Sequence, residues 1–138
     1  MISAHISRAS AVFLGLVAVG LIFASDAIVP RLIPGFPSGG AWLGQLLGAA
    51  WFAVATLNWL SGATLLGGIY GRPLVLTNAT LYFIATMVLV KIVWHNGSVA
   101  LWTLFVPIAL LCGAYVWLLF RGPFERDFAL QRSIDERT

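Results

Sequence analysis

The side chains with the greatest capacity for chemistry lie near the ends of apolar stretches. Lys91 and His95 are four residues apart in the stretch "MVLVKIVWHNG", which is otherwise almost entirely apolar. Residues at i and i+4 share one face of a helix. Asp26, at the end of an earlier apolar run, is expected at a similar depth. A partly desolvated pair of Asp26 and Lys91, with His95 beside it, is therefore a candidate outer polar site.

Lys91 also has a simpler interpretation, as an anchor at the membrane surface, and we favour it. A lysine near the end of a spanning helix extends its ammonium group to the lipid headgroups while its stem stays in hydrocarbon. Trp94 beside it, and Trp42 and Trp102 at the same expected level, fit an outer aromatic belt.

The other reactive residues do not have the spacing of a metal or catalytic site. His5 and His95 are expected on opposite sides of a membrane, so they cannot bind one metal within a single chain. No HExxH, CxxC or GxSxG pattern is present, and Cys112, the one cysteine, lies in an apolar run. We therefore expect no catalytic residue and no metal site, and the residues imply no cofactor.

A second candidate site lies on the apolar run that contains Trp51. Six positions fall within about 80° of Trp51 when each residue advances about 100° around a helix. These positions are Gly44, Gly48, Ala55, Asn58, Trp59 and Gly62. Small residues on one stripe let helices approach closely, and Gly44 with Gly48 make a GxxxG spacing. We expect a packing seam here, and a ligand groove lined by Trp51 and Trp59 is the alternative.

Asn58 is the polar side chain expected deepest in the bundle. It lies about ten residues, or roughly 15 Å, from the cytoplasmic end of its run, where an amide needs a partner. We expect it opposite Ile84 and Ala85, and within reach of Tyr82 for an interhelical hydrogen bond worth about 1 kcal/mol. Contact with a quinone or a lipid is the alternative. The candidate ligand-binding residues are then Trp51, Asn58, Trp59 and Tyr82.

Membrane-spanning helices have to position these residues. Of the 138 residues, 60% are hydrophobic and 9% are charged, whereas a soluble domain has roughly 25% charged residues. A spanning helix needs about 20 predominantly apolar residues. Four runs qualify, namely 9–29, 41–67, 74–93 and 99–120. We therefore predict one all-α integral membrane domain, residues 1–138, folded as an antiparallel up-down four-helix bundle.

Basic residues set the predicted orientation. Arg31 and Lys91 fall on one side of a four-span bundle. The other side holds Arg8, Arg72, Arg121, Arg126, Arg132 and Arg137. Both termini are therefore predicted to be cytoplasmic, because short cytoplasmic loops carry the excess of basic residues. Since these residues are spread along helix ends, the net charge of +3 does not indicate nucleic-acid binding.

Two segments lie outside the predicted spans. Pro30 is expected to end the first helix. The connection around it is expected to lie along the outer membrane interface or to cap the bundle, through its apolar residues Ile28, Leu32, Ile33 and Phe36. Residues 123–138 are expected to form a short amphipathic helix on the cytoplasmic surface, resting on lipid or on a partner.

The central segment "LGQLLGAAWFAVATLNWLSGATLLGGIYGRPLVLTNATLYFIATM" resembles DoxX-like small bacterial membrane proteins, in which a Gly- and Leu-rich second span leads into a short basic turn. The resemblance covers about a third to a half of the chain. It implies a small accessory subunit of a quinone-dependent redox complex, and it carries over no catalytic residue.

Three functions are compatible with these features. The first is a non-catalytic accessory or assembly subunit of a bacterial inner membrane, in contact with lipids and part of a larger complex or a homo-oligomer. The second is a quinone- or lipid-binding module. The third is a small-solute pathway along Asn58, Thr64, Asn78 and Tyr82. We favour the first, because the sequence places no charged residue deep in a span and carries no reactive motif.

Overall fold

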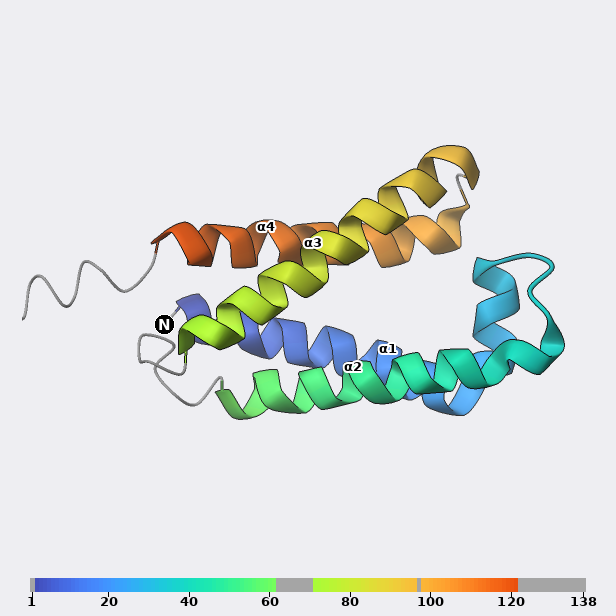
Figure 1. Ribbon diagram of the computed structural model, residues 1–138, viewed down its shortest axis with the longest axis horizontal. Helices are drawn as coiled ribbons and strands as arrows, with labels where there is room; N and C mark the ends of the chain where they lie inside the picture. The colour runs from blue at the N-terminus through green and yellow to red at the C-terminus, as the bar shows by residue number, and fades with distance from the viewer. Residues whose placement is uncertain (1, 62–70, 97, 122–138) are drawn as a thin grey trace, which may run out of the picture.

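The computed structural model describes residues 2–61, 71–96 and 98–121, and every regular element within them is a helix (Figure 1). The long helices are α1 (Ile2–Leu32), α2 (Ala41–Ser61), α3 (Gly71–Asn96) and α4 (Val99–Arg121). A short 3-10 helix, η1 (Ser38–Gly40), precedes α2. The prediction of an all-α chain with four long helices is confirmed for the residues described.

The surfaces of these helices are those of a membrane protein. All four long helices are long and apolar enough to cross a bilayer. Phe23, Trp94 and Phe120 are 82%, 86% and 83% exposed, and many further large apolar side chains are exposed with them. Soluble proteins rarely expose contiguous apolar surface of this extent. The chain therefore has the character of a multi-pass membrane protein.

Helix α1 is longer than its predicted span and is irregular at a different residue. It continues past Pro30 to Leu32, and its non-helical residue is Ala24, with φ −133° and ψ 29°. The prediction that Pro30 ends the helix is wrong. Proline has a helical φ and removes only one backbone N–H donor from the helix. After Pro30 the helical hydrogen-bond pattern is present again, since the Ile33 N–H donates to the Val29 carbonyl at 2.8 Å.

The other helix ends differ less from the predicted runs. Helix α2 begins at Ala41 as predicted, and α3 extends the predicted run 74–93 by one short turn at each end. The predicted end of the second span, 62–67, and the predicted tail helix, 123–138, lie outside the described residues.

Helices α1 and α2 pack along a seam of small residues. The buried residues of α2 are Gly44, Gly48, Ala55 and Asn58. They are four, seven and three residues apart, which follows the three- or four-residue period of a helix-packing stripe. A Cβ atom on Gly48 would lie 2.9 Å from the Ala18 carbonyl oxygen, which is closer than real Cβ atoms approach. The predicted packing seam is confirmed for these residues, and Gly62 lies outside the described part of the chain.

The facing stripe of α1 repeats the same spacing. Its buried residues include Ser7, Ala11, Leu14, Ala18, Leu21 and Ser25. The Ser25 hydroxyl donates to the Ala41 carbonyl at 2.8 Å, which joins the region near the irregular residue of α1 to the first residue of α2. Two stripes with matched spacing keep the pair in contact along most of its length.

The second pair, α3 and α4, meets the first mainly at one end. Helix α3 packs on α4, and α4 also contacts α1. Figure 1 shows the two pairs close together near the start of α1 and farther apart toward the opposite end. All four helices contribute to the core, which includes Leu14, Ala55, Tyr82, Ile108 and Tyr115. The two ends of the bundle therefore differ: the end near the start of α1 is closely packed and contains polar side chains, and the opposite end is more open and apolar.

Candidate functional site

Two buried asparagines join α2 to α3 by a reciprocal pair of hydrogen bonds. The side-chain amide of Asn58 donates to the side-chain oxygen of Asn78 at 2.8 Å, and the amide of Asn78 donates to the oxygen of Asn58 at 2.8 Å. The Asn78 amide also donates to the Leu74 carbonyl at 2.9 Å. Both side chains are fully buried, so each satisfies the other where water is absent.

Two serines extend this arrangement to α1. The Asn58 amide donates to the Ser10 hydroxyl oxygen at 2.9 Å, and the hydroxyls of Ser10 and Tyr82 share a hydrogen bond of 2.6 Å. The Ser7 hydroxyl donates to the backbone carbonyl of Asn58 at 2.7 Å. We call Ser7, Ser10, Asn58, Asn78 and Tyr82 the polar cluster. It ties together three helices through side chains that are all buried.

Tyr115 brings α4 to the polar cluster through its ring. The ring centroids of Tyr82 and Tyr115 lie 5.6 Å apart, with an interplanar angle of 19°. The Tyr115 hydroxyl is buried and has no hydrogen-bond partner among the described residues. The contact of α4 with the cluster is therefore aromatic stacking.

The partner of Asn58 differs from the predicted one. Asn58 bonds to Asn78 instead of lying opposite Ile84 and Ala85, and its connection to Tyr82 runs through the hydroxyl of an α1 serine. The predicted register is wrong, because a second amide both accepts a hydrogen bond from the first and donates one to it, which alkyl side chains cannot do.

An apolar cavity of about 500 Å³ lies toward the other end of the bundle, between α1, α2, α4 and the connection after α1. Its wall includes Phe13 and Leu16 from α1, Leu47 and Trp51 from α2, and Leu104 from α4. A volume of this size is within the range of small-molecule sites, roughly 300–1,000 Å³. Its wall suits a hydrocarbon group.

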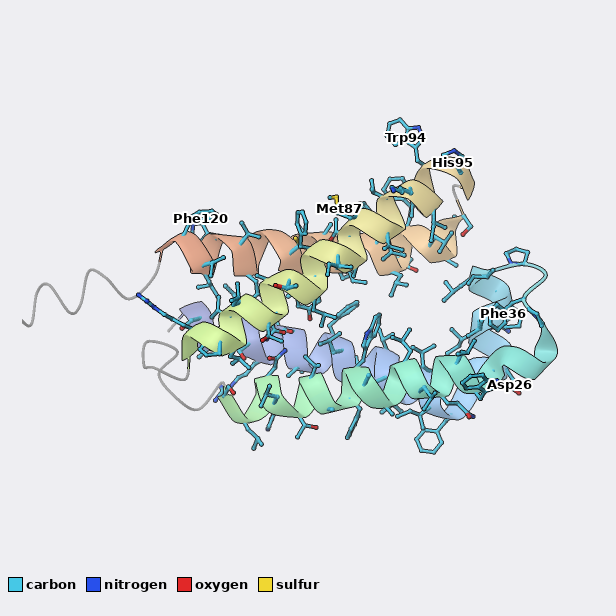
Figure 2. All side chains as sticks on the ribbon, viewed as in Figure 1. Asp26, Phe36, Met87, Trp94, His95 and Phe120 are labelled. Carbon is cyan, nitrogen blue, oxygen red and sulfur yellow. The ribbon has the colours of Figure 1, made fainter. Side chains whose placement is uncertain are left out.

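The last turns of α1 and the connection that follows supply one wall of this cavity. Ile28, Leu32, Ile33 and Phe36 all line it. Figure 2 shows Phe36 at the end of the molecule where α1 gives way to this connection. The sequence predicts two placements for these side chains, along the outer membrane interface or capping the bundle, and their position in the cavity wall agrees with the second. The irregular residue Ala24 lets the last part of α1 change direction so that they line the cavity.

Two side chains of the cavity wall carry polar atoms. The Thr103 hydroxyl donates to the Ala100 carbonyl of its own helix at 2.8 Å. The Trp51 indole N–H has no hydrogen-bond partner within the described part of the chain. The wall is otherwise hydrocarbon and glycine, so it offers no group that could hold a charge.

The four predicted ligand-binding residues occupy three different places. Trp51 lines the cavity. Asn58 and Tyr82 are enclosed in the polar cluster. Trp59 is 58% exposed on the outer surface of α2. The structure therefore does not bring the four together around one space, and Trp51 is the member that faces a cavity.

The predicted outer polar residues are also apart. Asp26, Lys91 and His95 are all exposed. The Nδ1 atom of His95 lies 3.0 Å from the Lys91 carbonyl, one helical turn away. Figure 2 shows Asp26 on α1 and His95 on α3, well separated from each other. In the structure the two α3 residues form no cluster with Asp26.

The described residues include no group of three His, Cys, Asp or Glu side chains placed to hold a metal ion. No protein-family model matches this chain, and neither a curated protein nor a solved structure matches it. The resemblance to DoxX-like proteins therefore stays a prediction. The polar cluster and the cavity are the two candidate functional features of the described residues.

Proposed function

We propose that this chain is a non-catalytic, multi-pass protein of a bacterial inner membrane that holds the hydrocarbon chain of a membrane amphiphile in the apolar cavity. The observation that carries the proposal is the cavity itself, about 500 Å³ with a wall of apolar residues from three helices and one connection. This is the second of the three functions suggested by the sequence.

The chemistry of the wall supports a hydrocarbon occupant. An empty space beside Leu16, Leu47 and Leu104 would leave their methyl groups without partners on one side, and a hydrocarbon chain restores those dispersion contacts. A charged headgroup would have to be desolvated with no counter-charge in the wall. The occupant therefore places its chain in the cavity and keeps any charged group outside it.

The polar cluster has a supporting role in this proposal. Its hydrogen bonds hold Ser7, Asn58 and Asn78 together at one end of the bundle. Such bonds contribute about 0.6 kcal/mol each on average in membrane proteins, and more in favourable cases. Fastening the helices at this end lets the α1–α2 pair and the α3–α4 pair stay farther apart toward the end that holds the cavity.

Membrane orientation is part of the proposal. Contacts between Ser7 and Asn58 and between Ser25 and Ala41 support an antiparallel arrangement of α1 and α2. Arg8 in the first turns of α1 and Arg72 in the first turn of α3 support cytoplasmic termini. In this orientation the polar cluster lies toward the cytoplasm and the cavity toward the outer surface.

The accessory-subunit hypothesis rests on the sequence alone and stays a prediction. A partner protein would be found by native mass spectrometry of the chain extracted gently from its own membrane. A stoichiometric partner would support the accessory role, and it would be compatible with an occupied cavity.

The proposal is tested by blocking the cavity. Leu16 lines it and is 71% exposed, so Leu16→Trp adds bulk in the cavity without entering the packed core. Leu110→Trp is the matched control, because Leu110 is 69% exposed on α4 and is not part of the wall. Each protein is placed in phospholipid bilayers that also contain an uncharged long-chain lipid, and lipids retained after ejection are identified and counted by native mass spectrometry.

We expect the unaltered chain and Leu110→Trp to retain about one long-chain lipid per protein, and Leu16→Trp to retain much less. Equal retention by the two variants, or no retention by the unaltered chain, would overturn the proposal. Equal helical circular dichroism of the three proteins shows that the comparison is between folded chains.

A further inference from the structure

Trp51 is a hydrogen-bond donor in a wall that is otherwise nearly free of polar atoms. Its side chain lines the cavity, and its indole N–H has no partner within the described part of the chain. Nor is that nitrogen among the fully enclosed unpartnered atoms, which are the hydroxyl oxygens of Thr86 and Tyr115. The protein therefore does not fully enclose the N–H of this cavity-lining side chain.

The position of Trp51 along α2 places this donor deep in the membrane. It lies ten residues from Ala41 and ten from Ser61, the two ends of α2 as described, which is about 15 Å along the axis from either end. The hydrocarbon core of a bilayer is about 30 Å thick. A donor at this depth has no water to bond to, so its partner has to come from the protein or from a lipid.

The protein offers little as a partner in the cavity. Thr103 is the other polar residue of the wall. Its hydroxyl donates to the Ala100 carbonyl, and no hydrogen bond joins its oxygen to the Trp51 N–H. The remaining wall groups are hydrocarbon or glycine. The acceptor for Trp51 would then come from the occupant.

We infer that the cavity selects an uncharged lipid that carries a carbonyl group deep in the membrane, and that Trp51 is the residue that determines this specificity. The inference rests on the proposed function, that the cavity holds a membrane amphiphile. Phospholipids do not meet the requirement, because their charged headgroups keep the ester carbonyls near the water interface. An uncharged lipid can sink until its carbonyl reaches the donor.

Two kinds of lipid have this chemistry, a ring carbonyl on an isoprenoid chain and an ester carbonyl on a neutral glyceride. Ubiquinone and dioleoylglycerol are the two probes, and squalene, a hydrocarbon without a carbonyl, is the reference. The protein is labelled with ¹⁵N-tryptophan in phospholipid nanodiscs. The Trp51 indole N–H resonance is assigned from its loss in Trp51→Phe, a substitution that keeps an aromatic ring in the wall.

We expect at least one carbonyl lipid to shift the Trp51 N–H proton downfield, and squalene to leave that proton without such a shift. Trp51→Phe should weaken binding of the carbonyl lipid by roughly three- to tenfold, the loss expected for one hydrogen bond, and should leave squalene binding unchanged. The control Trp59→Phe alters a tryptophan outside the cavity wall and should leave both affinities unchanged.

The outcomes separate the inference from the proposed function. A downfield shift with ubiquinone alone or with dioleoylglycerol alone identifies which carbonyl source is selected. If squalene and the carbonyl lipids bind equally well, with or without the Trp51 N–H, the cavity holds hydrocarbon without this specificity and the inference is overturned. If none of the three lipids binds, the proposed function itself fails.

Discussion

Tyr82 and Tyr115 stack with ring centroids 5.6 Å apart, yet their hydroxyls differ: Tyr82 shares a hydrogen bond with Ser10, while Tyr115 has no partner among the described residues. Both side chains are 1% exposed. The two tyrosines therefore share the same ring contact and the same burial, and they differ in that only Tyr82 makes a hydrogen bond within the described part of the chain.

The first prediction compares the two tyrosine-to-phenylalanine substitutions. Tyr82→Phe removes a buried hydrogen bond and leaves the Ser10 hydroxyl with one partner fewer, so the free energy of unfolding should fall by about 1 kcal/mol. Tyr115→Phe removes a buried hydroxyl that has no hydrogen-bond partner among the described residues, so stability should be unchanged or slightly higher. Unfolding in mixed micelles measures both. Equal losses for the two variants would show that the Tyr115 hydroxyl has a partner.

The second prediction concerns the reciprocal amide pair. Asn58→Ala leaves both Asn78 groups that faced it unpaired in the core, so unfolding free energy should fall by about 1–3 kcal/mol. The double variant Asn58→Ala with Asn78→Ala should cost less than the sum of the two single variants, with a coupling of about 0.5–2 kcal/mol. Thr77→Ala is the control, since the Thr77 hydroxyl is exposed and bonds within its own helix. Strict additivity of the two asparagine variants would contradict the pairing.

The third prediction contrasts two glycines. A Cβ on Gly48 would meet the Ala18 backbone oxygen at 2.9 Å, whereas no atom lies within 4 Å of a Cβ on Gly113. Gly48→Ala should push α1 and α2 apart and cost about 1–3 kcal/mol. Gly113→Ala should be neutral or slightly stabilising, because alanine stabilises a helix relative to glycine by up to about 1 kcal/mol.

Unfolding free energies of the two alanine variants, measured in the same micelle, provide the test. A Gly48→Ala protein as stable as the Gly113→Ala protein would mean that the glycine seam does not set the distance between the two helices.

The glycine seam of α2 could be predicted from the sequence, because it depends on the periodicity of a single helix. Gly44, Gly48, Ala55 and Asn58 share one face because helical periodicity alone places them there, and the structure buries all four. Trp59 falls on the same calculated stripe but is 58% exposed. A stripe about 160° wide is broader than the contact between two helices, so its edge residues reach the outer surface.

The polar cluster and the cavity depend on features that lie outside any one helix. Which residue faces Asn58 is set by the register of α2 against α1 and α3, and a shift of one helical turn would pair it with a different residue. Ser7 precedes the predicted span 9–29 and shows no sign in sequence of reaching Asn58. The irregular residue of α1 is Ala24. Alanine is the residue that most favours a helix, so the sequence does not predict the change of direction that builds the cavity wall.

The last prediction tests the membrane orientation with two exposed positions near opposite ends of α1. In a Cys112→Ala background, Gly39→Cys places a thiol in the connection before α2, where a Cβ meets no atom within 4 Å. His5→Cys places one in the first turns of α1, beside Arg8 and the polar cluster. Since basic residues favour the cytoplasmic side, an impermeant maleimide should label Gly39→Cys in intact spheroplasts and His5→Cys after permeabilisation. The reverse pattern would place the termini outside, and labelling of both from one side would mean that α1 does not cross the membrane.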